Sequence, residues 1–457
     1  MGFHNPISTP LPMNDQRDCP VSTASRQALE CSERALWHLV SFFGDPLAAL
    51  DATLAADPGW GLARLMKADF IFTLTEPAML AQARAEVDAA RPLMAHANDR
   101  ERTHFTASEL CLAGRWREAS EVWDELLRRH PRDLLALLCA HLFDFYRGDA
   151  RALRARVARV LPEWPQDDPL QPYVLGMYAF GLEECNLYAQ AEAVGRRALS
   201  GPAQVPWAVH AVAHVMEMQG RHAEGAAWLQ DQTAGWALDN GLSGHNWWHL
   251  ALFRLETLDT AAALKLHDDH LAGAKASVNL QWLDAAALLW RLQLLGVDVG
   301  ARWQTLAQAW ADPVGCAGHY AFNDLHALLA LLGSGDVALA QALLAAVRAR
   351  SSDAQHHGAD NRAMALEVGL PLMQGLLAQT TGKPHECIAA LWPVRAVAHR
   401  FGGSHAQRDL IDQSLLAAAA QAGDQALARA LLNERRCAKP ATPLTQYWAQ
   451  RTGLQSN

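Results

Sequence analysis

The sequence predicts an all-α protein built from helix-turn-helix repeats that stack into a right-handed superhelical solenoid. Alanine and leucine recur at helical spacing along the whole chain. Alternating Val/Ile/Thr stretches bounded by Asn-Gly or Asp-Gly turns, which mark β-hairpins, do not occur. One turn-like motif also returns at a nearly constant interval, which is typical of stacked helical repeats.

The repeat is clearest in GRWREASEVWDELLRRHP, residues 114–131. Gly114 precedes the aromatic residue Trp116, and the small residue Ala119 and a second aromatic residue, Trp123, follow before a final proline. A small residue lets two antiparallel helices approach, an aromatic ring fills the space beside it, and proline ends the helix. The pattern is the second-helix half of a tetratricopeptide repeat.

The same register recurs on both sides of this segment. Clear copies start at Gly114, Gly148, Asn186, Gly220 and Leu258, at intervals of 34, 38, 34 and 38 residues, and weaker copies start near Gly44, Gly296, Gly335, Gly382 and Gly423. An interval near 34 residues is that of tetratricopeptide repeats, so we expect one array of about ten helix pairs. The expected array covers residues 18–446, between a flexible N-terminal segment (1–17) and a flexible C-terminal tail (447–457).

Composition narrows the classes of function. The 457 residues contain 39 Lys+Arg and 48 Asp+Glu, a formal charge of −9, which disfavours a nucleic-acid binder because such proteins need a basic face. No run of 18 apolar residues and no signal-peptide core occur, so no membrane span or secretion is expected. The eight cysteines form no CxxC pair, which fits a reducing compartment and a cytoplasmic location.

Polar residues gather at positions that face the inner surface of such an array. Its first helices line the concave side, with positions 2, 5, 9 and 12 inward when the turn residue is position 15. In VHAVAHVMEMQGR, His210, His214 and Glu217 take positions 5, 9 and 12. In GHNWWHLALF, His245 takes position 2 and His249 follows one helical turn later. The sequence therefore predicts a cluster of imidazoles and carboxylates in the groove.

Two later first helices add further candidates. FNDLHALLALLG carries Asn323, Asp324 and His326, and GGSHAQRDLIDQ opens a helix with Gln407, Arg408 and Asp409. A helix start with a guanidinium group suits a carboxylate or phosphate, although an ordinary cap explains it equally well. Trp247, between the two histidines of its helix, is predicted to wall an apolar pocket beside the polar one.

Several interpretations of the cluster compete. A divalent metal ion can be held by His210, His214, Glu217 and His249, although HxxxHxxE is not the HExxH signature. The same groups can act as general acid and base, since imidazole titrates near neutral pH. They can also form a hydrogen-bonded polar seam between helices or line a peptide-binding groove.

Several long motifs together resemble the tetratricopeptide repeat protein 38 family. They are DCPVSTAS, GRWREASEVWDELLRRHPRD, VHAVAHVMEMQGR, GHNWWHLALF, FNDLHALLALLG, VGLPL and GGSHAQRD, and they run in the same order from about residue 18 to about residue 446. The resemblance implies an all-helical repeat protein and says little about activity. The positions that carry over are His210, His214, Glu217, His245, Asn246, His249, Asn323, Asp324, His326, Gln407, Arg408 and Asp409.

The first functional hypothesis is a concave pocket that binds a small polar molecule or short peptide. If the pocket is catalytic, a hydrolase or lyase-type reaction is expected, with a divalent metal ion as the candidate cofactor. The candidate catalytic residues are His210, His214, Glu217, His245, His249, Asp324 and His326, and the candidate substrate-binding residues are Asn246, Trp247, Asn323, Gln407, Arg408 and Asp409. The second hypothesis is a non-enzymatic adaptor that holds a partner segment in the groove. A homo-oligomer is compatible with both.

Overall fold

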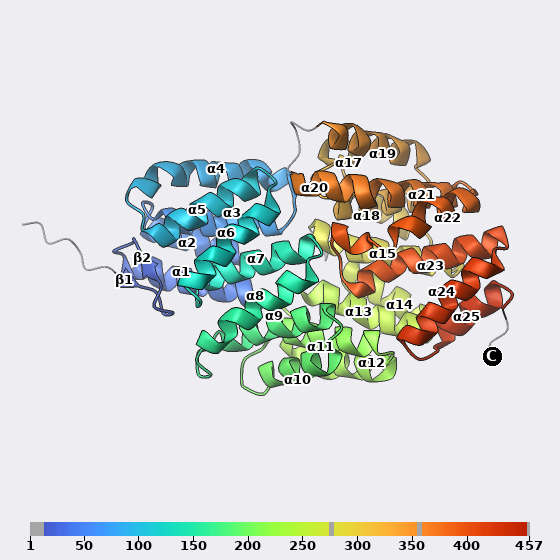
Figure 1. Ribbon diagram of the computed structural model, residues 1–457, viewed down its shortest axis with the longest axis horizontal. Coiled ribbons are helices and arrows are strands. Elements are labelled where there is room, and N and C mark those ends of the chain that lie inside the picture. Colours follow the sequence, from blue (N-terminus) through green and yellow to red (C-terminus); the bar gives the residue numbers. More distant parts are fainter. Residues whose placement is uncertain (1–12, 274–277, 354–358, 455–457) are drawn as a thin grey trace, which may run out of the picture.

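A computed structural model describes residues 13–273, 278–353 and 359–454, which form an all-α array of paired helices (Figure 1). The pairs of the first half are α1 (Arg26–Ser41) with α2 (Pro46–Ala56), α3 (Gly61–Thr73) with α4 (Leu80–Ala90), α5 (Asp99–Leu112) with α6 (Trp116–Arg129), α7 (Leu134–Tyr146) with α8 (Ala150–Val160), and α9 (Gln171–Glu184) with α10 (Tyr188–Ala198). Those of the second half are α11 (Pro206–Met218) with α12 (His222–Asp231), α13 (Ser243–Glu256) with α14 (Thr260–Leu266), α15 (Asn279–Leu294) with α16 (Arg302–Ala307), α18 (Ala321–Ser334) with α19 (Val337–Ser352), α21 (Leu370–Thr380) with α22 (Pro384–Val394), and α23 (His405–Ala422) with α24 (Gln425–Ala438).

Shorter elements connect or extend these pairs. They are the hairpin of β1 (Met13–Asn14) and β2 (Pro20–Val21), the helices α17 (Pro313–Cys316), α20 (Ala359–Met364) and α25 (Pro443–Arg451), the π-helical turns η5 (His267–Leu271) and η7 (Ala365–Gly369), and the 3₁₀ turns η1 (Pro77–Met79), η2 (Arg91–Ala95), η3 (Leu161–Glu163), η4 (Thr233–Gly235) and η8 (Ala398–Phe401).

Left-handed turns separate the two helices of each pair. All ten predicted repeat starts, from Gly44 to Gly423, have φ between 59° and 87°, including the non-glycine residues Asn186 and Leu258. Thr75, with φ of 52°, makes a further turn of this kind between α3 and α4. The described residues therefore contain eleven pairs rather than about ten, since the pair of α3 and α4, with its turn at Thr75, was not among the predicted repeat starts.

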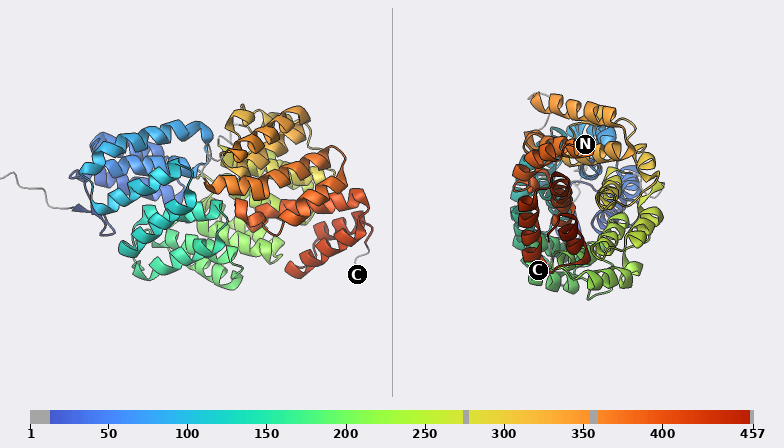
Figure 2. Two further views of the ribbon diagram at one scale, coloured as in Figure 1. Left: turned by 45° about the horizontal axis from the view of Figure 1, so that its top comes forward. Right: turned by 90° about the vertical axis from the view of Figure 1, so that its right-hand side faces the viewer.

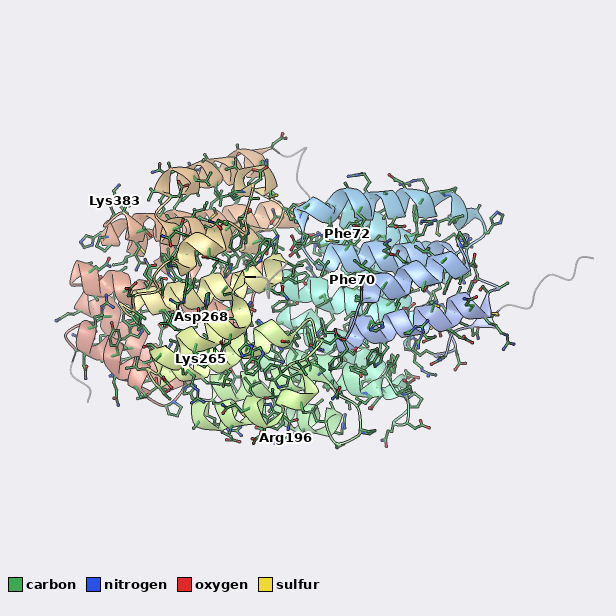
Figure 3. The ribbon with its side chains drawn as sticks, turned by 180° about the vertical axis from the view of Figure 1, so that it is seen from behind. Phe70, Phe72, Arg196, Lys265, Asp268 and Lys383 are labelled. Atoms are coloured by element: carbon green, nitrogen blue, oxygen red, sulfur yellow. The ribbon has the colours of Figure 1, made fainter. Side chains whose placement is uncertain are left out.

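The second helices form the outer surface of the array. Helix α6 buries a single stripe, which includes Ala119 and Trp123, and exposes the rest of its circumference. Charged side chains such as Arg196 of α10 and Lys265 of α14 project outward, with 46% and 76% of their surface exposed (Figure 3). This one-sided burial is what a helix at the edge of a solenoid requires.

Several first helices are buried on all sides. In α11 every residue from Pro206 to Glu217 is buried, so its concave face is covered as well as its flanks. Helix α23 packs against both α11 and α15, and α25 packs against α13, so the C-terminal helices close over the interior. Viewed from the C-terminal end, helices surround the interior on all sides (Figure 2). The inner surface is therefore a closed interior rather than an open groove.

Distant turns join the two halves of the array. The backbone of Gly241 donates to the carbonyl of Phe42 across 2.7 Å, and the Phe42 ring stacks on Trp207 with 5.2 Å between centroids. The turn at Gly148 lies so close to the backbone at His399 that a β-carbon would be 1.6 Å from its carbonyl oxygen, so this turn requires glycine.

Parts of both predicted flexible ends pack against the rest of the structure. Arg17 is buried and donates to both carboxylate oxygens of Glu33, at 2.7 and 2.8 Å, so residues 13–17 belong to the folded part. Helix α25 continues to Arg451 and buries Trp448 completely, because that ring packs into the core. The remaining parts of the predicted ends, residues 1–12 and 455–457, lie outside the described residues.

Asp69 on α3 offers a test of the buried polar network of the first pairs. The Ser108 hydroxyl donates to its Oδ1 across 2.7 Å, while its Oδ2 has no partner among the residues that the structure describes. Burial raises the pKa of this carboxyl to about 7. Because the folded carboxyl holds its proton more tightly than the unfolded one, its ionisation destabilises the fold as the pH rises from about 4 to 7.

We expect Asp69→Asn to increase the free energy of unfolding at pH 8 by about 2 to 3 kcal/mol more than at pH 4.5, as urea denaturation would measure. The exposed Asp231 of α12 supplies the control, Asp231→Asn, which should change neither value. An Asp69→Asn effect that is equal at both pH values would contradict the raised pKa.

Candidate functional site

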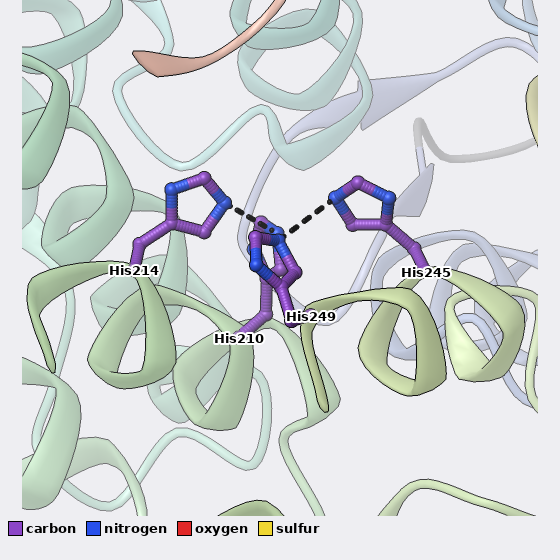
Figure 4. A group of neighbouring side chains, drawn as sticks. All are labelled: His210, His214, His245 and His249. Carbon is purple, nitrogen blue, oxygen red and sulfur yellow. Dashed lines mark hydrogen bonds between the residues drawn. The ribbon is translucent and has the colours of Figure 1, made fainter. Parts of the chain in front are cut away.

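Four histidines from two neighbouring first helices meet in the interior. His210 and His214 lie one turn apart on α11, and His245 and His249 lie one turn apart on α13 (Figure 4). The Nε2 atoms of His210 and His214 are 2.9 Å apart, and those of His245 and His249 are 3.2 Å apart. One ring nitrogen from each of the four lies within 4.8 Å of the others. The structure therefore brings together the four histidines of the predicted cluster.

Acidic side chains lie next to the outer nitrogens of three of these rings, and two of the three contacts are hydrogen bonds. The Nδ1 atom of His249 lies 3.0 Å from Glu217, that of His245 lies 2.8 Å from Asp284 on α15, and that of His214 lies 3.5 Å from Glu183 on α9. Carboxylates at the outer nitrogen of a metal-binding imidazole hold the ring in place and make its inner nitrogen a better ligand. The four inner nitrogens therefore form a group that could hold a metal ion.

The four inner nitrogens differ from the predicted metal-binding set in one member, with His245 in place of Glu217. The predicted metal-binding set contained Glu217, but the structure places its carboxylate behind His249 rather than beside the inner nitrogens. His245 fills the fourth place, because its position near the start of α13 brings its ring 4.9 Å from that of His210.

The hydrogen bonds of the cluster can bring the Nε2 lone pairs of His245 and His249 into unfavourable contact. If each Nδ1–H donates to its carboxylate, both Nε2 atoms carry lone pairs and face each other across 3.2 Å. Burial, followed by His245 and Arg291, lowers the pKa of His249 well below its usual range, so the ring is neutral. A cation between the inner nitrogens removes this repulsion.

One arrangement of protons also removes this repulsion. Burial raises the pKa of the Glu217 carboxyl to about 7, and a protonated Glu217 can donate to Nδ1 of His249. His249 then carries its proton on Nε2 and donates to His245. The cluster therefore supports either a bound cation or a chain of neutral hydrogen bonds.

Aromatic rings enclose the four histidines. Phe180 of α9 lies 5.3 Å from His210 and 5.4 Å from His214 between ring centroids, and Trp248 stacks on His245 at 5.2 Å. Such walls exclude water and strengthen electrostatic interactions in the site. The side chain of His245 is 19% exposed, whereas His214 and His249 have no exposed side-chain surface.

The predicted residues of α18 have partners elsewhere. The Asp324 carboxylate accepts from the backbone N–H of Gly318, and the Asn323 amide donates to Thr75 across 3.1 Å. His326 is bonded through Nδ1 to the carbonyl of Phe322 at 2.8 Å. These contacts hold α18 against its own preceding loop and against the turn after α3, and none of them reaches the four histidines.

Arg408 and Asp409, at the start of α23, line a cavity of about 420 Å³ together with Glu217. Gln407 and Ser404 form a reciprocal capping box, as the plain alternative expected. Arg408 lies 3.5 Å from the Glu184 carboxylate, and Asp409 accepts from Arg435 across 2.7 Å. Arg408 is therefore paired within the protein. Its partner Glu184 is the residue that follows Glu183 on α9.

The two remaining predicted residues lie beside the cluster. Trp247 stacks on His270 with 3.8 Å between centroids and lies 4.7 Å from Trp236, so its ring packs away from the inner nitrogens. Asn246 is fully buried, and neither atom of its amide has a partner among the described residues.

Sequence reasoning missed two supporting carboxylates. Glu183 stands three residues before the turn at Asn186, the same repeat position that Glu217 has before Gly220, so the repeat register contained a usable signal for it. Asp284 takes another position and is brought to His245 only by the packing of α15 on α13.

Comparison with known proteins concerns the fold. No protein-family model matches the chain. A solved structure described as the crystal structure of the APC/C hetero-tetramer Cut9-Hcn1 superimposes with a TM-score of 0.43 and 12% sequence identity, over 93% of this chain and 76% of that chain. Among the residues that the structure describes, no helix is long and apolar enough to cross a membrane.

Proposed function

We propose that this helical repeat protein binds a divalent transition-metal ion through His210, His214, His245 and His249 and acts with it on a small molecule in its closed interior. The convergence of four inner nitrogens, three of them backed by carboxylates, carries the proposal. Imidazole ligands suit zinc, copper, iron and nickel. Tetrahedral zinc with bonds of 2.0–2.1 Å separates its nitrogen ligands by about 3.3 Å. The Nε2–Nε2 separations within the two histidine pairs are 2.9 and 3.2 Å.

The exposure of His245 supports a catalytic rather than a purely structural ion. Structural zinc sites are closed by four protein ligands, whereas catalytic sites keep three and leave one place for water or substrate. His210, His214 and His249 are buried, while the His245 side chain is 19% exposed. We expect His245 to be the ligand that yields its place to water or substrate, and metal-assisted hydrolysis is the reaction class that this arrangement favours.

The closed interior favours a small molecule over a partner segment. An adaptor needs an open groove wide enough for a helix or an extended peptide. Here α23 packs against α11 and α15, and the inner face of α11 is fully buried. We also propose that the protein is related to the tetratricopeptide repeat protein 38 family and that it is located in the cytoplasm. The eight cysteines are all free thiols, which supports a reducing compartment.

Elemental analysis tests the metal directly. Protein purified without a histidine tag or chelator is expected to contain about one transition-metal ion per chain, and the chelator-treated protein is expected to take up one Co²⁺ or Zn²⁺. The Co²⁺ form should show the visible absorption of a four- or five-coordinate site with nitrogen ligands. Metal below a tenth of an equivalent, together with no uptake by the treated protein, would instead favour the chain of neutral hydrogen bonds.

The supporting carboxylates give a second prediction. Glu217→Gln and Asp284→Asn keep an oxygen that accepts from Nδ1 but remove its charge, so each is expected to weaken zinc affinity by about 10- to 100-fold. Competition with a chromophoric chelator measures the change. Glu224→Gln, on the outer side of α12, is the matched control and should leave the affinity unchanged. Unaltered affinity in both site variants would remove these carboxylates from the centre.

A further inference from the structure

An apolar cavity lies between the first helices of the N-terminal pairs and the starts of α11, α13 and α15. Its volume is about 350 Å³, and its wall includes Phe42, Phe70, Leu138, Leu142, Trp207 and Leu280 (Phe70 is labelled in Figure 3). A cavity of this kind stays dry unless polar groups line it, and it gains stability from an apolar occupant.

Two of the polar groups at the wall, on Tyr146 and His38, are bonded within the protein. The Tyr146 hydroxyl donates to the carbonyl of Thr73 across 2.6 Å, and Nδ1 of His38 lies 2.6 Å from the carbonyl of Phe43. Neither group needs a partner from a ligand, so the wall selects for hydrocarbon rather than for hydrogen-bonding groups.

The cavity adjoins the four-histidine cluster through the geometry of three helices. Trp207, Leu242 and Gln281 line the cavity, and His210, His245 and Asp284 each follow one of them by three residues. Three residues advance a helix by about 4.5 Å, so the cluster begins one turn beyond the cavity wall. The Trp207 ring, which lines the cavity, lies 5.8 Å from that of His210.

We propose that this cavity is the chamber for the apolar tail of the substrate, whose polar head reaches the histidines. The inference rests on the proposed metal centre and specifies its substrate class, a carboxylic acid or acid derivative with an aliphatic or aromatic tail. A cavity of about 150 Å³ accommodates benzene, so the present volume accommodates a tail of roughly ten to fourteen carbon atoms.

Binding of three probes to the metal-loaded protein tests the chamber. Decanoate is expected to bind at least 100-fold more tightly than butanoate, because each buried methylene contributes about fourfold. Decan-1-ol, which keeps the tail but lacks the carboxylate, is expected to bind more weakly than decanoate and still far more tightly than butanoate. Calorimetry measures all three. Equal affinity for decanoate and butanoate would overturn the chamber and leave the metal centre untouched.

Filling the cavity gives an independent measurement. Leu142→Trp, or Phe70→Trp on α3 if the first variant fails to fold, is expected to reduce decanoate affinity at least tenfold at unchanged metal content. Leu238→Trp, at a leucine that is 83% exposed, is the matched control. Unchanged decanoate affinity in a folded filling variant would contradict the chamber. If instead the wild-type protein binds no metal but still binds decan-1-ol in a manner that Leu142→Trp blocks, the chamber stands and the metal centre fails.

Discussion

Replacing His249 by glutamine is expected to lower zinc affinity by at least about 1,000-fold, because the change removes one of the inner ligands and breaks the link to Glu217. His249 lies close to all three other histidines of the cluster. Its ring lies 4.3 Å from that of His214, 4.7 Å from that of His245 and 5.1 Å from that of His210. His214→Gln should have a similar effect, since His214 makes the corresponding contacts on α11.

The helical array should survive this replacement. Each repeat buries its apolar surface against its neighbours, so one polar exchange leaves most of the packing intact. Wild-type protein is expected to gain about 4 kcal/mol of stability when zinc is present at 1,000 times its dissociation constant, and the variant should gain almost nothing. Circular dichroism and thermal denaturation with and without zinc measure both effects.

His326→Gln is the control for this experiment. His326 is as deeply buried as the cluster histidines, but it is bonded to the Phe322 carbonyl on its own helix. Its variant should retain one metal ion per chain. Retention of a full equivalent of zinc by both His249→Gln and His214→Gln would rule out the four-histidine centre.

Replacing Glu256 by glutamine is expected to destabilise the fold by about 3 kcal/mol at pH 7, because removal of one partner leaves buried charge without compensation. Glu256 ends α13 and accepts from Arg435 at 2.5 Å, from Lys439 at 2.8 Å and from Thr442 at 2.7 Å. These contacts hold the C-terminal segment over the interior. Arg435 also keeps Asp409 as a partner, which places the expected loss at the lower end for such pairs.

The pH dependence of this loss follows from the pKa of Glu256. Burial alone would raise the pKa of the carboxyl, but Arg435 and Lys439 together hold it well below its usual range. The stabilisation is therefore complete above the unfolded pKa, near 4.3, and decreases as the pH falls below it. Urea denaturation should show a difference between wild type and Glu256→Gln that is constant from pH 6 to 8 and shrinks below about pH 4.

Glu434→Gln provides the matched comparison. Glu434 also pairs with an arginine, Arg395, but 55% of its side chain is exposed. Its removal should cost less than about 1 kcal/mol, as for other surface pairs. An equal loss in the two variants would show that the buried position of Glu256 contributes nothing.

Much of the fold was predictable because repeats are encoded locally. The repeat pattern marked ten of the eleven left-handed turns that join paired helices, from Gly44 to Gly423. It missed only the turn at Thr75, which had neither a glycine nor a neighbouring helix in clear register. Periodicity also placed His210, His214 and Glu217 on one inward stripe. These features depend on spacing along a single helix, which sequence reports directly.

The sequence by itself determined the helix pairs, their turns and the two histidine pairs that face the interior. Only the tertiary structure decided that α23 and α25 close this interior, that Asp284 and Glu183 support the histidines, and that Asp324 and His326 lie apart from them. The physical reason is that helical spacing fixes which residues share a face, whereas the curvature of the array sums small rotations between repeats. The total rotation decides which helix faces meet, and it cannot be read from the sequence of any single repeat.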